Sequence, residues 1–197
     1  MKKLCLVGCG KMAIEYSKVL NALNVNFDVV GRSIKSAEKF EKEVGKKVIT
    51  GGLDSYIRNN QRLPELAINA VGVEELSLVT NALLDSDYKK ILVEKPVSLD
   101  INDIQLIKKN ALKKNAEVYV AYNRRFYAST IRCQEIILND GGVKSFNFEF
   151  TEWSHIIKKL EKSPRIKQNW LLANSTHVID LAFFFRRNTR KNIKLCR

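Results

Sequence analysis

Short apolar runs alternate with longer amphipathic stretches along residues 1–122. The runs are rich in Val, Ile and Leu and are apolar at consecutive positions, which is typical of strands buried on both faces of a parallel sheet. The stretches between them repeat apolar residues at spacings of three and four, as amphipathic helices do. This order predicts an α/β protein with a Rossmann doubly wound parallel sheet.

The predicted elements of this part follow one another closely. Strands are expected at 4–7, 27–30, 47–50, 66–71, 91–93 and 118–121. Helices are expected at 36–44, 53–60, 74–84 and 101–114, and Asp100 is the predicted N-cap of the last one. Another helix follows the first strand, and its predicted buried face carries Met12, Tyr16, Val19, Leu20 and Leu23.

The pattern changes after Tyr122. A helix is predicted at 128–138, and phenylalanines at alternate positions predict a half-buried strand at 146–150. We therefore expect a dinucleotide-binding Rossmann domain at 1–122. The remainder, 123–197, is expected to open a second domain of α+β type.

A glycine-rich turn follows the first predicted strand. Its sequence, Gly8-Cys9-Gly10-Lys11-Met12-Ala13, has the form G-x-G-x-x-A and opens a helix, which is the context that a dinucleotide fingerprint requires. The first glycine permits a tight turn, the second lets the backbone approach a pyrophosphate, and Ala13 allows close packing of helix and strand. The helix N-terminal amides would then face the phosphates. The alternative is a purely structural glycine turn.

The end of the second predicted strand bears on the choice of cofactor. An acidic residue there would accept a hydrogen bond from the ribose 2′-hydroxyl of NAD. This chain instead has Val30-Gly31-Arg32-Ser33, and a guanidinium with a hydroxyl suits a 2′-phosphate, which favours NADP while leaving NAD possible. Alternatively, Arg32 stacks on adenine or faces solvent.

Three further motifs complete the pattern. Glu94-Lys95-Pro96 ends the fifth predicted strand, where the ligands of parallel sheets bind, although this tripeptide is commonplace by itself. Tyr122-Asn123-Arg124-Arg125-Phe126 follows the sixth strand, and Asn174-Ser175-Thr176-His177-Val178-Ile179-Asp180 lies further on. Together with the glycine turn, these motifs resemble the Gfo/Idh/MocA family of NAD(P)-dependent oxidoreductases.

The resemblance implies roles for two residues. Lys95 would lie beside the nicotinamide and polarise the substrate oxygen, and His177 would act as general acid and base. His177 and Asp180 share one helical face. Relatives commonly carry an aspartate four residues before this histidine, where this chain has Ala173, so that a carboxylate from elsewhere or Asn174 would orient His177. The alternative for His177 is a hydrogen-bonded helix residue near a core.

We assign candidate site residues on this basis. Lys95 and His177 are the catalytic candidates. The cofactor candidates are Gly8, Cys9, Gly10, Lys11, Met12, Arg32, Ser33, Val71, Glu94 and Lys95. The substrate candidates are Tyr122, Asn123, Arg125, Asn174 and His177. No metal site is expected, because the four cysteines lack the spacing of metal ligands and are expected to be reduced thiols.

The net charge of +13 raises nucleic acid as a partner, but its distribution argues against one. Six of the Lys and Arg residues lie in 186–197, a segment without Asp or Glu, and the others are interspersed with acids on predicted helices. A DNA-binding protein would lose salt-sensitive binding when 186–197 is removed. Without a signal peptide or an apolar run long enough for a membrane, we expect a cytoplasmic protein that does not bind membranes.

The end of the chain differs from the rest. Residues 186–197 lack an amphipathic period, and a frameshift near 183–185 would explain such an aberrant tail and a truncated second domain. The resemblance implies that 123–197 is an incomplete α+β domain that serves the substrate or oligomerisation. It also implies the expected function, which is hydride transfer between a nicotinamide cofactor and a sugar, cyclitol or nucleotide-sugar hydroxyl or carbonyl. The alternative is a truncated, catalytically impaired protein that binds dinucleotide without turnover. The resemblance implies that full-length relatives are homo-oligomers.

Overall fold

The structure, a computed structural model, describes residues 3–187. The chain divides into two compact units, Met1–Ala121 and Tyr122–Arg197. The tail expected to be aberrant lies outside the described residues from position 188 onward, as does Cys196. Between residues 3 and 187, no helix combines the length and the apolar character needed to cross a membrane.

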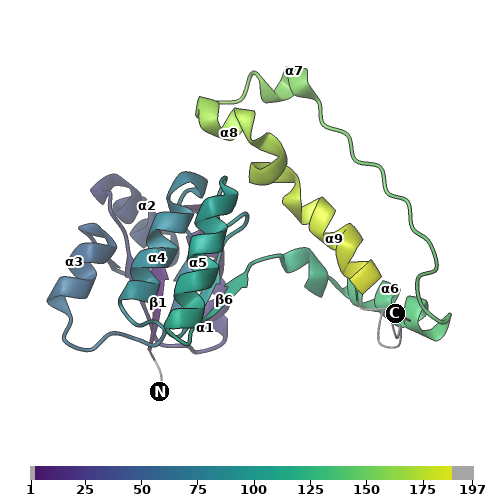
Figure 1. Cartoon of the computed structure of the whole chain (residues 1–197). Coiled ribbons are helices and arrows are strands. Elements are labelled where there is room, and N and C mark those ends of the chain that lie inside the picture. The colour runs from purple at the N-terminus through teal and green to yellow at the C-terminus, as the bar shows by residue number, and fades with distance from the viewer. Residues whose placement is uncertain (1–2, 188–197) are drawn as a thin grey trace. The chain divides into compact units, whose positions relative to one another are not determined.

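The first unit is built on one parallel sheet, as predicted (Figure 1). Its strand order is β3-β2-β1-β4-β5-β6, and each neighbouring pair is parallel. This order confirms the Rossmann prediction, and the direction of winding reverses between β1 and β4. The strands are β1 (Leu4–Val7), β2 (Phe27–Val30), β3 (Val48–Ile49), β4 (Leu66–Asn69), β5 (Lys90–Val93) and β6 (Glu117–Val120).

Helices cover both faces of this sheet (Figure 1). Helices α1 (Lys11–Ala22) and α2 (Ile34–Val44) pack on one face, where Ile14 and Phe40 join a buried apolar cluster. Helices α3 (Gly52–Asn59), α4 (Leu76–Asp85) and α5 (Ile101–Lys113) pack on the other, where Tyr56, Leu83 and Ile107 are buried. The two clusters explain why the predicted strands are apolar at consecutive positions.

Strand β1 shows this two-sided burial directly. Cys5 and Val7 belong to one cluster, whereas Leu4 and Leu6 belong to the other. Burial raises the pKa of the Cys5 thiol to about 12, so this thiol stays protonated at neutral pH. The cysteines at 5, 9 and 133 are free thiols.

Helix α1 buries only part of the predicted face: Leu20 is buried and Tyr16 is half-buried. Met12, Val19 and Leu23 are exposed, and this part of the prediction is wrong. The buried face combines the small Ala13 and Ser17, which allow the helix axis to approach the strands closely, with the larger Ile14 and Leu20. The buried residues of α1 are Ala13, Ile14, Ser17 and Leu20.

The ends of other helices and strands differ by a few residues from the ends predicted from the sequence. The helix predicted from residue 74 begins as a short 3-10 helix, η1 (Val73–Glu75), which leads into α4. The predicted cap of α5 is confirmed, since the Asp100 carboxylate accepts a hydrogen bond from the Asn102 amide at 2.9 Å.

Only helices occur in the described part of the second unit. They are η2 (Asn123–Phe126), α6 (Ala128–Asn139), α7 (Ser154–Ile157), α8 (Pro164–Gln168), the π-helix η3 (Leu171–Ser175) and α9 (Thr176–Arg187). Helix α6 confirms the helix predicted at 128–138.

The strand predicted at 146–150 is wrong. Residues 145–153 form no regular element and run as an extended trace between α6 and α7 (Figure 1). The alternation survives, because the rings of Phe146 and Phe148 stack at 6.2 Å and both contact Phe183 of α9. A strand also needs a neighbour to hydrogen-bond with, and the described residues supply none.

Leu83→Ala should destabilise the first unit by about 2–5 kcal/mol, because the fully buried side chain leaves a cavity. Chemical denaturation followed by far-UV circular dichroism measures this change. Leu78→Ala on the same helix is the matched control; Leu78 is 67% exposed, so its loss should cost less than about 0.5 kcal/mol. Equal losses for both variants would contradict the core described above.

Candidate functional site

The turn after β1 depends on a glycine at position 8. Gly8 has a φ of +115°, and a Cβ built on it would lie 2.5 Å from the carbonyl oxygen of Ala70. The Gly8 amide donates to the carbonyl of Val30 at 2.8 Å, and the Ala70 amide donates to Val7 at the same distance. The turn is thus held between the ends of β2 and β4, where no other residue fits.

The N-terminus of α1 opens onto free space. Gly10 precedes the helix with a φ of −87° and a ψ of −172°, and a Cβ built there would meet nothing within 4 Å. No side chain caps this end. The amides of the first turn have no partner within the helix and carry a partial positive charge, which suits phosphate. Lys11 and Met12 are exposed there, and Ala13 is fully buried.

Gly31 contributes a second close approach that the sequence analysis did not assign. A Cβ at Gly31 would lie 2.9 Å from Cys9 Sγ and 2.9 Å from Val48. The Gly31 amide donates to Ile49 at 2.9 Å. Cys9 is half-buried, and burial raises the pKa of its thiol. Cys9 therefore packs the turn after β1 against the end of β2. In the sequence, the glycine that directly follows the second predicted strand indicated this close approach.

The two cofactor candidates after β2 have different surroundings. Arg32 is 80% exposed, and its Nη1 donates to Glu75 Oε2 at 3.5 Å. Ser33 is the N-cap of α2, and its hydroxyl oxygen accepts from the Ser36 amide at 3.4 Å. Arg32 therefore has room to bind a phosphate, whereas the Ser33 oxygen already stabilises a helix end.

The motif after β5 lies at the same edge of the sheet. The Glu94 amide donates to the Asn69 carbonyl at 2.9 Å, and the Glu94 carboxylate accepts from the Tyr16 hydroxyl at 2.6 Å. Burial, together with this carboxylate, raises the pKa of Tyr16. Lys95 is half-buried and forms a cis peptide bond with Pro96. Tyr16 thus links α1 to the candidate catalytic strand end, a contact that the sequence did not indicate.

Asn69 is a buried polar residue at the end of β4. Its Nδ2 donates to the Leu76 carbonyl at 2.9 Å and to the Thr80 hydroxyl at 3.0 Å, and its Oδ1 accepts from the Val71 amide at 3.5 Å. These bonds fix the turn that carries Val71, a half-buried cofactor candidate. An asparagine in an apolar strand was the signal that sequence analysis left unused.

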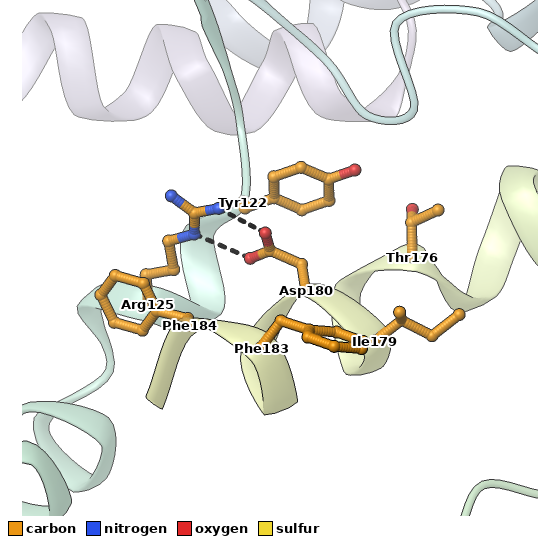
Figure 2. Close-up of a pocket in the computed structure, with 7 residues that line it drawn as sticks. All are labelled: Tyr122, Arg125, Thr176, Ile179, Asp180, Phe183 and Phe184. Atoms are coloured by element: carbon orange, nitrogen blue, oxygen red, sulfur yellow. Dashed lines mark hydrogen bonds and ion pairs between the residues drawn. The ribbon is translucent and has the colours of Figure 1, made fainter. Parts of the chain in front are cut away.

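The second unit pairs a cation and a carboxylate from distant segments. Arg125 of η2 binds Asp180 of α9 in bidentate fashion, with Nε donating to Oδ2 at 2.7 Å and Nη2 donating to Oδ1 (Figure 2). The two side chains are 32% and 14% exposed. The hydrogen bond to Asp180 raises the pKa of Arg125, so the guanidinium remains charged. Asp180, predicted to share a face with His177, is thus engaged by Arg125.

A cavity of about 300 Å³ adjoins this ion pair (Figure 2). The Arg125 guanidinium also lies 5.5 Å from the Tyr122 ring and 4.9 Å from the Phe184 ring. Polar groups therefore meet aromatic and aliphatic surface in one hollow, as in sites for small molecules. The cavity is lined by Tyr122, Arg125, Thr176, Ile179, Asp180, Phe183 and Phe184.

The other substrate candidates lie outside this lining. His177 contacts the Tyr122 ring edge-on, with centroids 5.9 Å apart and planes at 82°. Asn123 is exposed at the start of η2. Asn174 Nδ2 donates to Glu152 Oε1 at 3.3 Å. The structure thus places Tyr122 and Arg125 around the cavity, His177 against Tyr122, and Asn174 on Glu152.

Glu152 is a further residue that sequence analysis missed. Its Oε1 accepts a 2.6 Å hydrogen bond from the hydroxyl of Ser175, a residue that is almost fully buried. This bond is the main cause of a lowered pKa for Glu152. Through Ser175, the Glu152 carboxylate supports the π-helix η3, which precedes His177 and also contains the buried Ala173. Within residues 3–187, no group of His, Cys, Asp and Glu side chains is arranged so that it could bind a metal ion.

Gly8→Ala should lower the stability of the first unit by more than about 2 kcal/mol, because its Cβ would overlap the Ala70 carbonyl at a positive φ. Gly10→Ala should change stability by less than about 1 kcal/mol, because space and backbone conformation both admit a methyl group. Thermal unfolding followed by circular dichroism compares the two. A Gly10→Ala variant as unstable as Gly8→Ala would contradict the open space before α1.

Arg125→Ala should destabilise the second unit by about 1–3 kcal/mol, because it leaves the largely buried Asp180 carboxylate without its charged donor. Both tryptophans, Trp153 and Trp170, lie in this unit, so intrinsic fluorescence during urea unfolding is the measurement. The control is Arg132→Ala, whose exposed pair with Glu135 should contribute less than about 0.5 kcal/mol. If the Arg125→Ala variant and the wild-type protein unfold at the same urea concentration, the Arg125–Asp180 ion pair does not hold η2 to α9.

Comparisons with known proteins give matches through structure rather than through sequence. No family model and no curated protein matches this chain. The WlbA dehydrogenase from Bordetella pertussis, in complex with NADH and UDP-GlcNAcA, aligns with a TM-score of 0.74 and 14% identity over 93% of this chain and 59% of that chain. Apo scyllo-inositol dehydrogenase from Lactobacillus casei aligns with a TM-score of 0.60 and 16% identity over 71% of this chain and 42% of that chain.

GenD2 from gentamicin A biosynthesis, in complex with NAD, aligns with a TM-score of 0.63 and 18% identity over 73% of this chain and 41% of that chain. The chain therefore spans about half the length of these solved structures. At such identities the similarity establishes the fold. This protein shares its fold with these dehydrogenases.

Proposed function

We propose that the protein is a Gfo/Idh/MocA family oxidoreductase that exchanges a hydride between NADP and a hydroxyl or carbonyl carbon of a sugar, cyclitol or nucleotide sugar. The observation that carries this proposal is the open N-terminus of α1 behind Gly8 and Gly10, next to the reversal point of the sheet. Glu94-Lys95-Pro96 emerges at the same edge after β5. A dinucleotide at that edge would have its phosphates near the glycine turn and Lys95 near its redox end.

The residues present fit such a cofactor. The backbone before α1 leaves space that side chains would fill, and the helix end supplies amide donors for a pyrophosphate. The end of β2 carries no carboxylate and offers the exposed guanidinium of Arg32, which supports NADP over NAD. Similar structures are bound to NAD or NADH, and thus support the cofactor class without this finer choice.

We assign two tasks to residues of this chain: Lys95 polarises the reacting substrate oxygen, and His177 transfers its proton. When bound, the nicotinamide supplies hydride acceptance or donation at C4. The Lys95 ammonium group would donate a hydrogen bond to the reacting substrate oxygen. During oxidation His177 would take the hydroxyl proton as the carbon loses its hydride, and during reduction it would return that proton. An imidazole suits both directions because its ordinary pKa lies near neutrality.

The cavity of the second unit supports the substrate class. Its wall combines the Arg125–Asp180 pair and Tyr122 with the apolar surfaces of Phe183 and Phe184. A polyhydroxylated ring has hydroxyls for the polar side and C–H groups for the aromatic side. The names of the similar proteins, a scyllo-inositol dehydrogenase and a dehydrogenase with UDP-GlcNAcA, agree with this chemistry.

A second candidate is dinucleotide binding without turnover. It is favoured by the extended segment 145–153, whose aromatic residues stack without a neighbouring strand among the described residues. In either case we place the protein in the cytoplasm, where the free thiols at 5, 9 and 133 stay reduced.

Lys95→Ala and His177→Ala should each lower turnover by about 10²–10⁴-fold, because these groups act on the reacting oxygen and its proton. The His177→Ala variant should retain NADPH binding within a few-fold, because His177 is not a cofactor candidate. The measurements are NADPH oxidation with a panel of keto-sugars and keto-cyclitols, and NADPH fluorescence titration. The matched controls are Lys90→Ala, at the other end of β5, and His155→Ala in α7.

The wild-type protein separates the candidates. Turnover together with NADPH binding supports the enzyme, and binding without turnover across the panel supports the second candidate. A folded chain that binds neither NADPH nor NADH rules out both. Equal turnover by the Lys95→Ala and Lys90→Ala variants would remove Lys95 from the mechanism.

A further inference from the structure

An ion pair joins the two turns that flank the glycine turn. Arg32 follows β2 and Glu75 ends η1 after β4, and β2 and β4 are the two neighbours of β1 in the sheet. Arg32 Nη1 donates to Glu75 Oε2 at 3.5 Å, and the two side chains are 80% and 41% exposed. A carboxylate from the β4 side thus lies beside the end of β2, which carries none of its own.

We propose that Glu75 is a specificity-determining residue, which limits the preference of Arg32 for a nucleotide with a 2′-phosphate. This inference rests on the proposed function, since it concerns the adenosine end of the same dinucleotide site. Selectivity between NADP and NAD is then set by the Arg32–Glu75 pair and not by Arg32 alone.

The physical reason is the charge on each nucleotide. A phosphate monoester carries about −1.5 to −2 charges at neutral pH, and it would be bound by Arg32 within contact range of the Glu75 carboxylate. At that separation the repulsion is only partly screened, because the Debye length at 0.1 M salt is about 10 Å. A ribose 2′-hydroxyl carries no charge and is able to donate a hydrogen bond to the same carboxylate.

The position of Glu75 allows it to act on a ligand. Its amide donates to the Gly72 carbonyl at 2.9 Å, which holds the start of η1, and Leu76, the next residue, is fully buried. The backbone is therefore fixed while the carboxylate stays accessible. An exposed ion pair of this kind contributes little to stability, so that the pair exchanges readily for a ligand.

The experiment measures dissociation constants for NADPH and NADH with the whole chain at low ionic strength. Glu75→Gln should tighten NADPH binding about threefold to tenfold and leave NADH binding unchanged or slightly weaker. Arg32→Gln should weaken NADPH binding by about tenfold or more with a small effect on NADH. The gain in Glu75→Gln should shrink at high ionic strength.

Asp87→Asn is the matched control for the change in charge. Asp87 pairs with Lys114 and Lys89 before the start of β5. Its replacement by asparagine should change neither the NADPH nor the NADH dissociation constant. Circular dichroism verifies that each variant is folded. If Glu75→Gln leaves the ratio of the NADPH and NADH constants unchanged while both nucleotides bind, the role of Glu75 is wrong and the proposed function stands. If neither nucleotide binds the folded wild-type chain, the proposed function fails and this inference fails with it.

Discussion

Parallel pairing requires that every strand of the sheet end at the same edge. With the order β3-β2-β1-β4-β5-β6, the turn after β1 lies between the turns after β2 and β4, and β5 follows next. Residues that are far apart in the sequence, such as Gly8, Arg32 and Lys95, therefore emerge from one side of the sheet. The candidate cofactor site is a consequence of this direction of pairing, before any side chain is considered.

Close backbone approaches then shape that edge. Gly8 lies so near the Ala70 carbonyl that a side chain would overlap it, and Gly31 lies equally near Cys9 and Val48. These contacts bind the three turns to one another, whereas the space around Gly10, at the N-terminus of α1, stays open. Two glycines that look alike in the motif thus differ in their physical role: Gly8 permits the fold, and Gly10 leaves room for a ligand.

Most of the first unit could be predicted from sequence because its signals are local. Short apolar runs mark the strands, and Asp100 caps its helix by accepting a hydrogen bond from the Asn102 amide two residues away. The buried face of α1 could not be predicted from apolarity alone. Close packing on the sheet selects Ala13 and Ser17, while larger residues such as Val19 stay exposed. Small residues therefore share the helix–sheet contact with the larger apolar Ile14 and Leu20.

The second unit shows the limit of such local patterns. Alternation at 146–150 placed Phe146 and Phe148 on one side correctly, but strand formation depends on hydrogen bonds to another segment, which alternation does not encode. Helical spacing likewise placed Asp180 on the face of His177, yet the carboxylate binds Arg125, a residue 55 positions away. Because a charged group in a half-buried site is stabilised most by a bidentate partner, the distant guanidinium determines the role of Asp180. The ion pair therefore holds η2 against α9, and this contact determines the shape of the cavity.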